Sequence, residues 1–475
     1  MIENDPRFVL EYHGQGNLVV GGEVYGTGSF HLTRPQYQPA SSFTCTVLMD
    51  RIGTVADLDY RGGFSFAGVE SFGRRIEIPR LQQVSLRGSN PIRCRAAAPE
   101  VLVGIEEIES DPEQLVLRAL LTPSDAVSPL YQSETFTDDG RITSDQPIHP
   151  QNINSVLGTV VVQESYVFER IAGTGVEGDM RIRRLIAEVS PVVSPHTRYL
   201  PEIFRSFDHE LDDICTVLGF LGRQKSEWFE MVSSMFPAPR EGFAFSDRAD
   251  WFKAAIPPRT RRISTPIWDS STLPPDALDR LVSAYRQSSI RDGIRLAIEY
   301  LIASVEEGAL EARLVSTFTA LETVVDSVGK TEKTAHTMSG SQFKSLSSRV
   351  REVTRLFFEE RGLAQDLMAE SCAKVTELHR RPIVPRTLEI LEKHNIVQTD
   401  IWPDEISPEH GLKTAYNIRS ELVHAGRIID RDMAERMRSR VHALAERLIY
   451  RLLSGKDEWI HSHAYAYTHR LQQNL

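Results

Sequence analysis

The sequence is poor in the residue types that mark several protein classes. Its four cysteines, Cys45, Cys94, Cys215 and Cys372, lie far apart with no CxxC pair, which argues against a disulfide scaffold or a Cys-rich zinc module. There is no run of about 18 apolar residues, and the opening MIENDPRFVL lacks a basic segment followed by an apolar core. We therefore expect a cytoplasmic protein that does not associate with membranes.

Excess positive charge is also missing. The 475 residues include 54 Lys+Arg and 65 Asp+Glu, which gives a formal net charge of −11. This charge argues against binding of DNA or anionic membranes by bulk attraction, so any nucleic-acid site must be local. With 29 Gly, 25 Pro and 41% hydrophobic residues, the composition is that of a globular protein of about two to four domains.

Short apolar runs separated by Gly, Pro, Asn or Asp fill residues 8–190. Examples are FTCTVLM at 43–49 and LVLRALL at 115–121, and this spacing is typical of a β-sandwich or barrel. Pro79 interrupts a near-alternating stretch, which favours an edge strand or a bulge there. We predict an antiparallel β-rich, sandwich-like or barrel-like domain over residues 1–195.

A Gly-rich turn at Gly173–Gly178 matches the pattern GxGxxG. In dinucleotide-binding proteins these glycines let a pyrophosphate approach a helix N-terminus. The residues that follow are strand-like, so no helix dipole would hold the phosphate. A hairpin loop is the favoured interpretation.

Residues 196–290 are expected to form a mixed connecting region. They contain an amphipathic helix at 207–221, an aromatic stretch at 228–236 and a Pro-rich segment at 257–276. The composition of the last segment is typical of a connector between domains.

Two groups of histidines raise the question of a metal. His209 and Asp213 are four residues apart on the amphipathic helix, but a solvated polar face is the favoured interpretation. His461, His463 and His469 lie in the C-terminal segment, where chain ends are usually mobile. We expect no metal site and no cofactor.

Residues 291–455 are helical by period. Apolar residues recur three and four positions apart between 310 and 325 and again between 433 and 452, where the pattern stops at Ser454 and Gly455. We predict an all-α helical bundle over 291–455, followed by a tail at 456–475.

The helix GLKTAYNIRSELVHAGR carries Arg419 and His424, separated by four residues and followed by Gly426 as a stop signal. Only this pair has apolar helix positions around it, an aliphatic residue before the His and a small residue and Gly after it. Two other pairs have similar spacing but lack these surroundings, Arg7 with His13 and Arg436 with His442.

An Arg, four to six residues and a His near the end of a late bundle helix are the signature of the HEPN superfamily. The segment IRSELVHAGR, together with TALET on an earlier helix, most resembles the Apea-like HEPN branch. That branch is found in bacterial anti-phage proteins with a β-rich amino-terminal domain. The resemblance implies an α+β multidomain protein with a C-terminal HEPN-like bundle. It also implies a metal-independent endoribonuclease of abortive infection, whose N-terminal region senses a phage-derived trigger or restrains the nuclease.

The residue types suit RNA cleavage by the substrate's own 2′-hydroxyl. His424 could move protons near neutral pH, and the Arg419 guanidinium could hold charge on the phosphorane oxygens. Positions five apart lie about 140° around an ideal helix, so the two do not share a face. The long Arg side chain, a distorted last turn or a two-fold pair of helices could join them, and the resemblance implies dimers. We expect a homodimer or higher homo-oligomer with a composite cleft.

Neighbouring residues are candidates for supporting roles. Asn417 and Glu421 share a face with His424, and Asn417 could bind phosphate or sugar. Ser420 stands where many family members carry Asn, Asp or His, and its hydroxyl can donate to phosphate. Glu322 lies on the edge of an apolar stripe and either supports the site or is a rim residue with its carboxylate in water.

Other interpretations remain open for the site. Arg419 could form a salt bridge within the bundle, and His424 could cap the helix C-terminus. Residues 411–455 carry nine basic and five acidic side chains, which fits either a phosphate-binding surface or a solvated helix face. The alternative function is a non-catalytic HEPN scaffold that binds RNA, nucleotide or protein.

Overall fold

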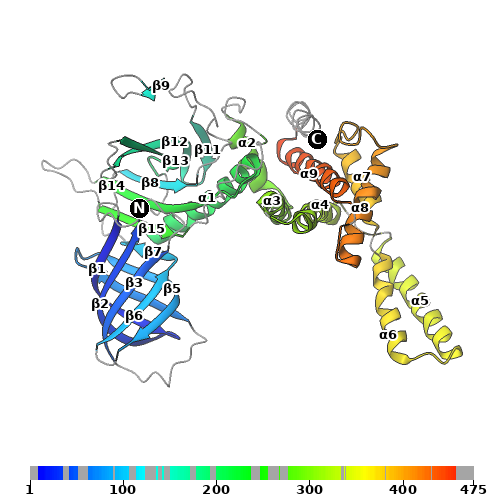
Figure 1. The fold of residues 1–475 in the computed structure, drawn as a ribbon, viewed down its shortest axis with the longest axis horizontal. Helices are drawn as coiled ribbons and strands as arrows, with labels where there is room; N and C mark the ends of the chain where they lie inside the picture. The colour runs from blue at the N-terminus through cyan, green and yellow to red at the C-terminus, as the bar shows by residue number, and fades with distance from the viewer. Residues whose placement is uncertain are drawn as a thin grey trace. The chain divides into compact units, whose positions relative to one another are not determined.

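The chain forms two compact units in the computed structural model (Figure 1). The first comprises Met1–Arg262 and Trp268–Ser283, and the second Ile263–Ile267 and Ala284–Leu475. The structure describes residues 9–35, 42–51, 63–88, 91–105, 114–122, 135–136, 142–143, 150–171, 178–192, 199–236, 247–254, 267, 276–306, 308–332, 336, 338–379, 381–428 and 430–455.

Six strands of the first unit close into an antiparallel barrel, drawn in blue in Figure 1. Their order is β5-β4-β1-β2-β3-β6, and a further pairing of β5 with β6 completes the ring. The expectation of an antiparallel β-rich, barrel-like N-terminal region is confirmed. The strands are β1 (Val9–Val20), β2 (Glu23–Pro35), β3 (Phe43–Arg51), β4 (Phe64–Glu70), β5 (Arg75–Arg87) and β6 (Ile92–Ala98).

Side chains from alternate positions along the strands fill the barrel. In β6 every second residue is buried, beginning with Ile92 and Cys94, which is the period expected of a strand with one face in the core. Of the two alternatives expected at Pro79, an edge strand or a bulge, the structure has the bulge, since Phe64 pairs with Leu81 while Phe66 pairs with Ile78. A proline that cannot donate a ladder hydrogen bond is tolerated at such a bulge.

The rest of the sheet continues from β5 in the order β7-β15-β14-β8-β13-β12-β11. It therefore includes two strands from the region expected to be a connector, β14 and β15, and α1 contacts β14. The division between the units falls inside α2 (Ala277–Gln287) rather than at residues 195 and 290, because long-range strand pairing joins these segments to the first unit. The remaining elements are β7 (Glu100–Val103), β8 (Gln114–Leu121), β11 (Gln151–Ser155), β12 (Gly158–Ile171), β13 (Gly178–Val189), β14 (Trp228–Phe236), β15 (Asp247–Lys253), α1 (Leu200–Gly222) and the separate pair β9 (Thr135–Phe136) and β10 (Ile142–Thr143).

The GxGxxG segment joins two paired strands. β12 and β13 pair antiparallel up to Ile171 opposite Gly178, and the pattern is followed by a strand. The hairpin interpretation is confirmed by this pairing, while turn residues 172–177 lie outside the described residues. Without a following helix, the dipole needed for a dinucleotide site is missing at this turn.

The polar positions of α1 differ from expectation. The apolar stripe Leu211, Ile214 and Leu218 is buried as predicted, but Asp213 is also buried, with 6% of its surface exposed. The expectation of a solvated polar face is therefore wrong at Asp213. Among the residues that the structure describes, no cluster of three metal-ligating side chains occurs. The C-terminal histidines lie outside those residues, as does the Pro-rich segment apart from Ile267 and Asp276.

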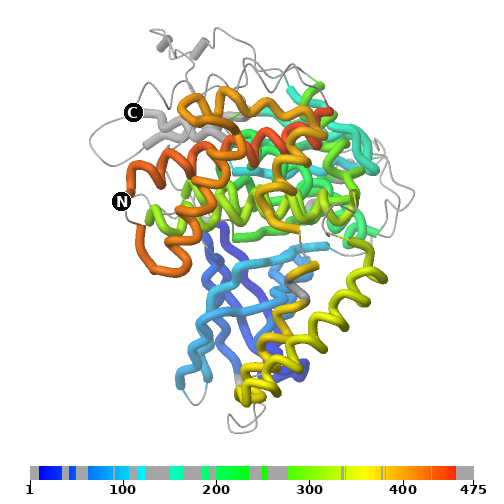
Figure 2. The backbone as a smooth tube through the Cα atoms, turned by 90° about the vertical axis from the view of Figure 1, so that its right-hand side faces the viewer, coloured from blue at the N-terminus to red at the C-terminus, as the bar shows by residue number. Residues whose placement is uncertain are grey.

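The second unit is helical, as the periodicity predicted. α4 is central and packs against α3, α7, α8 and α9, and α5 and α6, in yellow, extend away from these helices (Figures 1 and 2). No helix within the described ranges is both long and apolar enough to cross a membrane. The helices are α3 (Arg291–Glu306), α4 (Leu310–Thr331), α5 (Gly340–Glu360), α6 (Gln365–Lys374), the 3₁₀ helix η4 (Val375–His379), α7 (Ile383–Lys393), α8 (Pro408–Ala425) and α9 (Arg431–Ser454).

Candidate functional site

Local sequence fixes both ends of α8, the helix that carries Arg419 and His424. At its start the Ser407 side chain accepts a hydrogen bond from the His410 backbone N–H at 3.1 Å. At its end Gly426 adopts a left-handed φ of 67°, which glycine adopts without steric cost. The predicted stop at Gly426 is confirmed, and it leaves His424 in the last turn.

Packing places one side of α8 against α4. Leu412 is fully buried, and the Tyr416 ring lies edge-on to Phe318 of α4 with centroids 4.9 Å apart. Gly411 lies against the Trp402 ring, and any side chain at that position would collide with the indole. These contacts set the rotation of α8 about its axis.

That rotation brings Arg419 to Glu322. The Arg419 Nη2 donates to Glu322 Oε2 at 3.3 Å, across 97 residues of sequence. Both side chains are partly exposed, at 31% and 27%, while the Arg419 Nε is buried and has no hydrogen-bond partner among the residues that the structure describes. The pair is a salt bridge within the bundle, and it also fixes the direction of the guanidinium.

The surroundings of Glu322 disfavour its charged form. Burial raises the pKa of the Glu322 carboxyl above its ordinary value, the Arg419 charge and the Tyr416 hydroxyl oppose the rise, and nearby Asp326 adds to it. Burial, and next the Glu322 charge, raise the pKa of the Tyr416 phenol. Asp326 is itself paired with Arg386 of α7. The site thus combines one held cation with a carboxyl that binds protons more readily than usual.

His424 stands apart from this pair. His424, Asn417, Ser420 and Glu421 are all exposed on α8, so the four share the solvent side rather than the α4 side. Within the described residues no hydrogen bond or ion pair joins Arg419 to His424, as their separation of about 140° around the helix predicts. One chain alone therefore brings together Arg419 and Glu322 but not the Arg–His pair.

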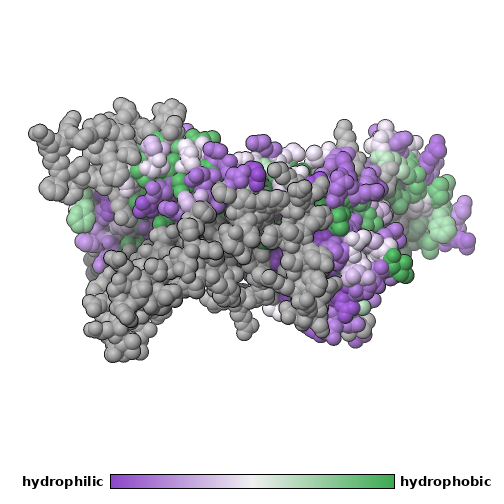
Figure 3. Space-filling model, turned by 90° about the horizontal axis from the view of Figure 1, so that it is seen from above, coloured by the Kyte–Doolittle hydropathy of each residue, from purple (hydrophilic) through white to green (hydrophobic). Residues whose placement is uncertain are grey.

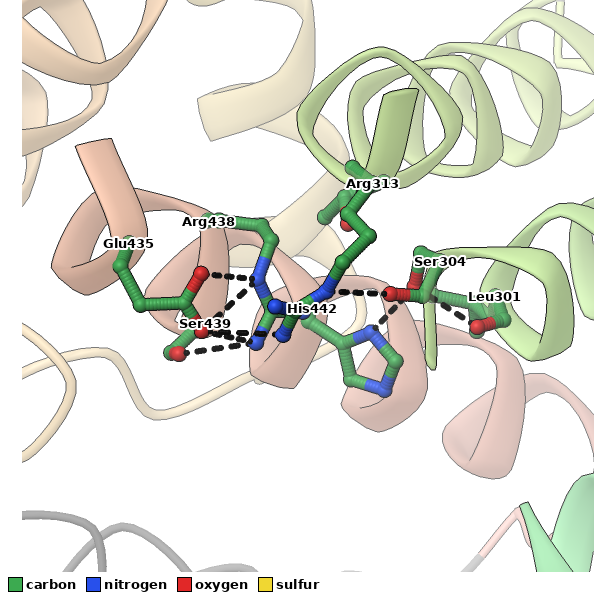
Figure 4. A network of polar contacts seen from close by, with 8 residues as sticks. Leu301, Ser304, Arg313, Glu435, Arg438, Ser439 and His442 are labelled. Carbon is green, nitrogen blue, oxygen red and sulfur yellow. Dashed lines mark hydrogen bonds and ion pairs between the residues drawn. The ribbon is translucent and has the colours of Figure 1, made fainter. Parts of the chain in front are cut away.

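In the similarly spaced pair Arg436 and His442, the histidine is buried and hydrogen-bonded inside the helical unit. His442 is 2% exposed, and its Nδ1 lies 3.1 Å from Ser304 Oγ (Figure 4). Its Nε2 lies 2.9 Å from Glu446 Oε1. Arg436 points elsewhere, 3.9 Å from Asp404. A buried imidazole held on both sides has no access to a polymer substrate.

Figure 4 shows that the polar network around His442 continues through α4 and α9. Arg438 binds Glu435 at 2.7 Å, and Arg313 binds the same carboxylate at 3.1 Å and the Ser304 carbonyl at 3.2 Å. Burial alone would raise the pKa of Glu435, but the hydrogen bonds and charges of Arg438 and Arg313 lower it below its ordinary value. This network ties the C-terminal helix to α3 and α4.

Three of the eight arginines counted in residues 411–455 turn inward, a feature that sequence reasoning missed. Arg438, Arg440 and Arg447 are all less than 10% exposed. Arg440 binds Asp404 at 2.7 Å, and Arg447 binds both carboxylate oxygens of Asp400. The acidic residues in the segment before α8 were the available signal. The basic surface left for phosphate is smaller than the sequence count suggested.

The third Arg–His pair falls partly outside the described residues. Arg7 is not among them, and His13 is exposed on β1, opposite His31 of β2. A strand at the barrel surface gives this histidine none of the helical context of His424.

Comparison with known protein families, curated proteins and solved structures found no match for this chain.

Proposed function

We propose that the helical unit is a HEPN-like ribonuclease domain of the Apea-like branch, and that the protein is a metal-independent endoribonuclease of bacterial anti-phage defence by abortive infection. One observation carries the proposal. Arg419 is held by Glu322 of the central helix α4, while His424 stands exposed in the last turn of the same helix, α8. A fixed cation and an accessible imidazole are the two groups that this chemistry needs.

The reaction would use the 2′-hydroxyl of RNA as nucleophile. His424 removes its proton while the 2′-oxygen bonds to the adjacent phosphorus, and the bond from phosphorus to the 5′-oxygen breaks. The leaving 5′-oxygen takes up a proton from solvent water, which gives a 2′,3′-cyclic phosphate and a 5′-hydroxyl. Arg419 contacts Glu322 through Nη2 and its Nε is buried, so the exposed part of the guanidinium supplies the donors for the phosphorane oxygens.

The geometry of α8 favours a site shared between two copies. Since Arg419 faces α4 and His424 faces solvent, the proposed cleft pairs Arg419 of one protomer with the partner subunit's His424 across a two-fold axis. The N-terminal unit then senses a phage-derived trigger or restrains the nuclease, a role that comes from the family resemblance alone.

The test is RNA cleavage by purified His424→Ala and Arg419→Ala variants, with His410→Ala as control for an exposed histidine of the same helix. Both site variants should lose cleavage and cell toxicity, while the control keeps them. Sequencing of RNA ends should show cyclic phosphates, and a chelator should leave the rate unchanged. If both site variants fold, dimerise and keep full cleavage and toxicity, this site is not the nuclease.

Mixing the two variants tests the shared cleft. A heterodimer of Arg419→Ala and His424→Ala has one site with both defects and one intact site, so random mixing should restore about a quarter of the activity. Sites contained within single chains would give no recovery.

A second candidate is a non-catalytic HEPN scaffold that binds RNA, nucleotide or protein. It is favoured by the Arg419–Glu322 pair, which already satisfies part of the guanidinium within one chain. Wild-type protein that binds RNA but never cleaves it, with binding weakened by Arg419→Ala, would support this scaffold.

A further inference from the structure

The α5–α6 hairpin leaves most of its apolar face uncovered. In α5, 21 residues long, only Ser347 is buried, and α6 has no buried residue. Figure 3 shows apolar surface at this hairpin, to the right of the view. We call its five exposed large side chains the hairpin strip: Val353 (66% exposed), Leu356 (44%), Phe357 (51%), Leu363 (45%) and Leu367 (50%).

The hairpin strip is as large as the largest apolar patch of a typical monomer, and such patches often function in binding. From the exposed fractions, the hairpin strip presents roughly 450 Å² of side chain, in the range where contiguous apolar patches mark interaction sites. Two helices that bury so little against each other also gain little from packing, and a helix as short as α6, with 10 residues, is marginal alone in water. Covering the strip would therefore stabilise the hairpin.

The charges that flank the strip on α5 indicate what covers it. Arg349 and Glu360 are eleven residues apart, which is three helical turns and within about 20° of the same face. The apolar residues of α5 that belong to the strip lie between them. Both charged side chains are exposed, and neither has an ion-pair partner among the residues described, whereas Arg355 is paired with Glu359 on another side of the helix.

This order of charges is complementary to itself when reversed. If a second α5 lies antiparallel about a two-fold axis, Arg349 meets Glu360 of the partner subunit at both ends, and the apolar residues between them meet each other. Two strips contribute roughly 900 Å², and with the flanking side chains the contact approaches the lower end of stable interfaces, about 1,200 Å².

We propose that the hairpin strip binds the same strip of a second copy of this chain in an antiparallel, two-fold arrangement. The resulting interface is a four-helix assembly of two α5–α6 hairpins. The hairpin strip is then the face by which the protein self-associates, and this role does not depend on whether the protein cleaves RNA.

The first test is the mass of the full-length protein by sedimentation velocity across a concentration series. The wild type should dimerise, and a Val353→Glu/Phe357→Glu variant should raise the dimer Kd by about 100-fold or more, because the two-fold axis repeats each defect. Ile406→Glu is the matched control, since Ile406 is 91% exposed in the same unit but lies outside the hairpin. A monomeric wild type, or a double variant that dimerises like the wild type, overturns the proposal.

Charge reversal provides a test that leaves the apolar residues untouched. Arg349→Glu and Glu360→Arg should each weaken the dimer, and the two together should restore it. Both side chains are exposed in the single chain, so circular dichroism should be unchanged. Failure of the double reversal to recover dimerisation contradicts the antiparallel register.

RNA cleavage separates this proposal from the proposed function. A variant that is monomeric yet still cleaves RNA would leave the hairpin interface standing and remove the shared cleft. A His424→Ala protein that keeps full activity as a dimer would remove the nuclease site and leave the interface standing.

Discussion

Two histidines with the same kind of spacing to an arginine should respond in opposite ways to removal. His442→Ala deletes an imidazole that is 2% exposed and that lies 3.1 Å from Ser304 Oγ and 2.9 Å from Glu446 Oε1. Two hydrogen bonds at about 1 kcal/mol each and a cavity costing about 1–2 kcal/mol give a destabilisation of about 3–4 kcal/mol. His424→Ala removes an exposed side chain and should change stability by less than about 0.5 kcal/mol.

The assay must resolve the helical unit, because a chain of two compact units need not unfold in one step. Amide hydrogen exchange of α3 and α9 peptides measures their local free energy of opening. His442→Ala should speed exchange in both helices, since Ser304 lies on α3 and His442 on α9. His442→Gln, which keeps one of the two polar contacts, should lose about half as much.

A His442→Ala protein that exchanges as slowly as the wild type would show that the two contacts of the imidazole do not stabilise α3 and α9. Faster exchange of α9 in His424→Ala would mean that His424 has a structural role, contrary to expectation. Loss of RNA cleavage in His442→Ala together with native exchange rates would make His442, and not His424, the candidate for catalysis.

Three further changes have expected outcomes. Arg447→Met removes the buried bidentate partner of a carboxylate and should destabilise the helical unit by about 3 kcal/mol in urea denaturation, while Arg436→Met at an exposed position should cost less than about 0.5 kcal/mol. Burial raises the pKa of the Glu322 carboxyl, so its stabilising contribution is fully present below the unfolded-state pKa and is lost as pH rises through the folded-state pKa. Glu322→Gln should remove that part of the stability-versus-pH curve, and identical curves would contradict it. Gly426→Ala forces a side chain into a φ of 67° and should cost about 1 kcal/mol, seen as faster amide exchange in the last turn of α8.

Local patterns predicted most of the elements. Alternation with turn residues indicated the β-rich part, and apolar repeats of three and four indicated the helical part. The stop at Gly426 and the bulge at Pro79 were also readable, because each depends on the conformational preference of one residue. At the site, a salt bridge of Arg419 within the bundle was one of the interpretations left open, and the structure forms it with Glu322.

Contacts between distant segments could not be predicted from the sequence. Closure of the barrel by β5 and β6 and the addition of β14 and β15 to the sheet depend on which strand edges meet, and periodicity does not encode this. The same holds for the arginines of α9. Their spacing resembles a solvated basic face, yet Arg438, Arg440 and Arg447 turn inward.

Most helices and strands could be predicted from the sequence, as could the end of α8 and the placement of Arg419 and His424 on different sides of that helix, because these features follow from the preferences of neighbouring residues. The burial of three arginines of α9, the enclosure of His442 while His424 is exposed, and the missing cover of the α5–α6 hairpin became visible only in the folded chain. Burial and charge pairing depend on segments far apart in the chain, which local preferences do not encode.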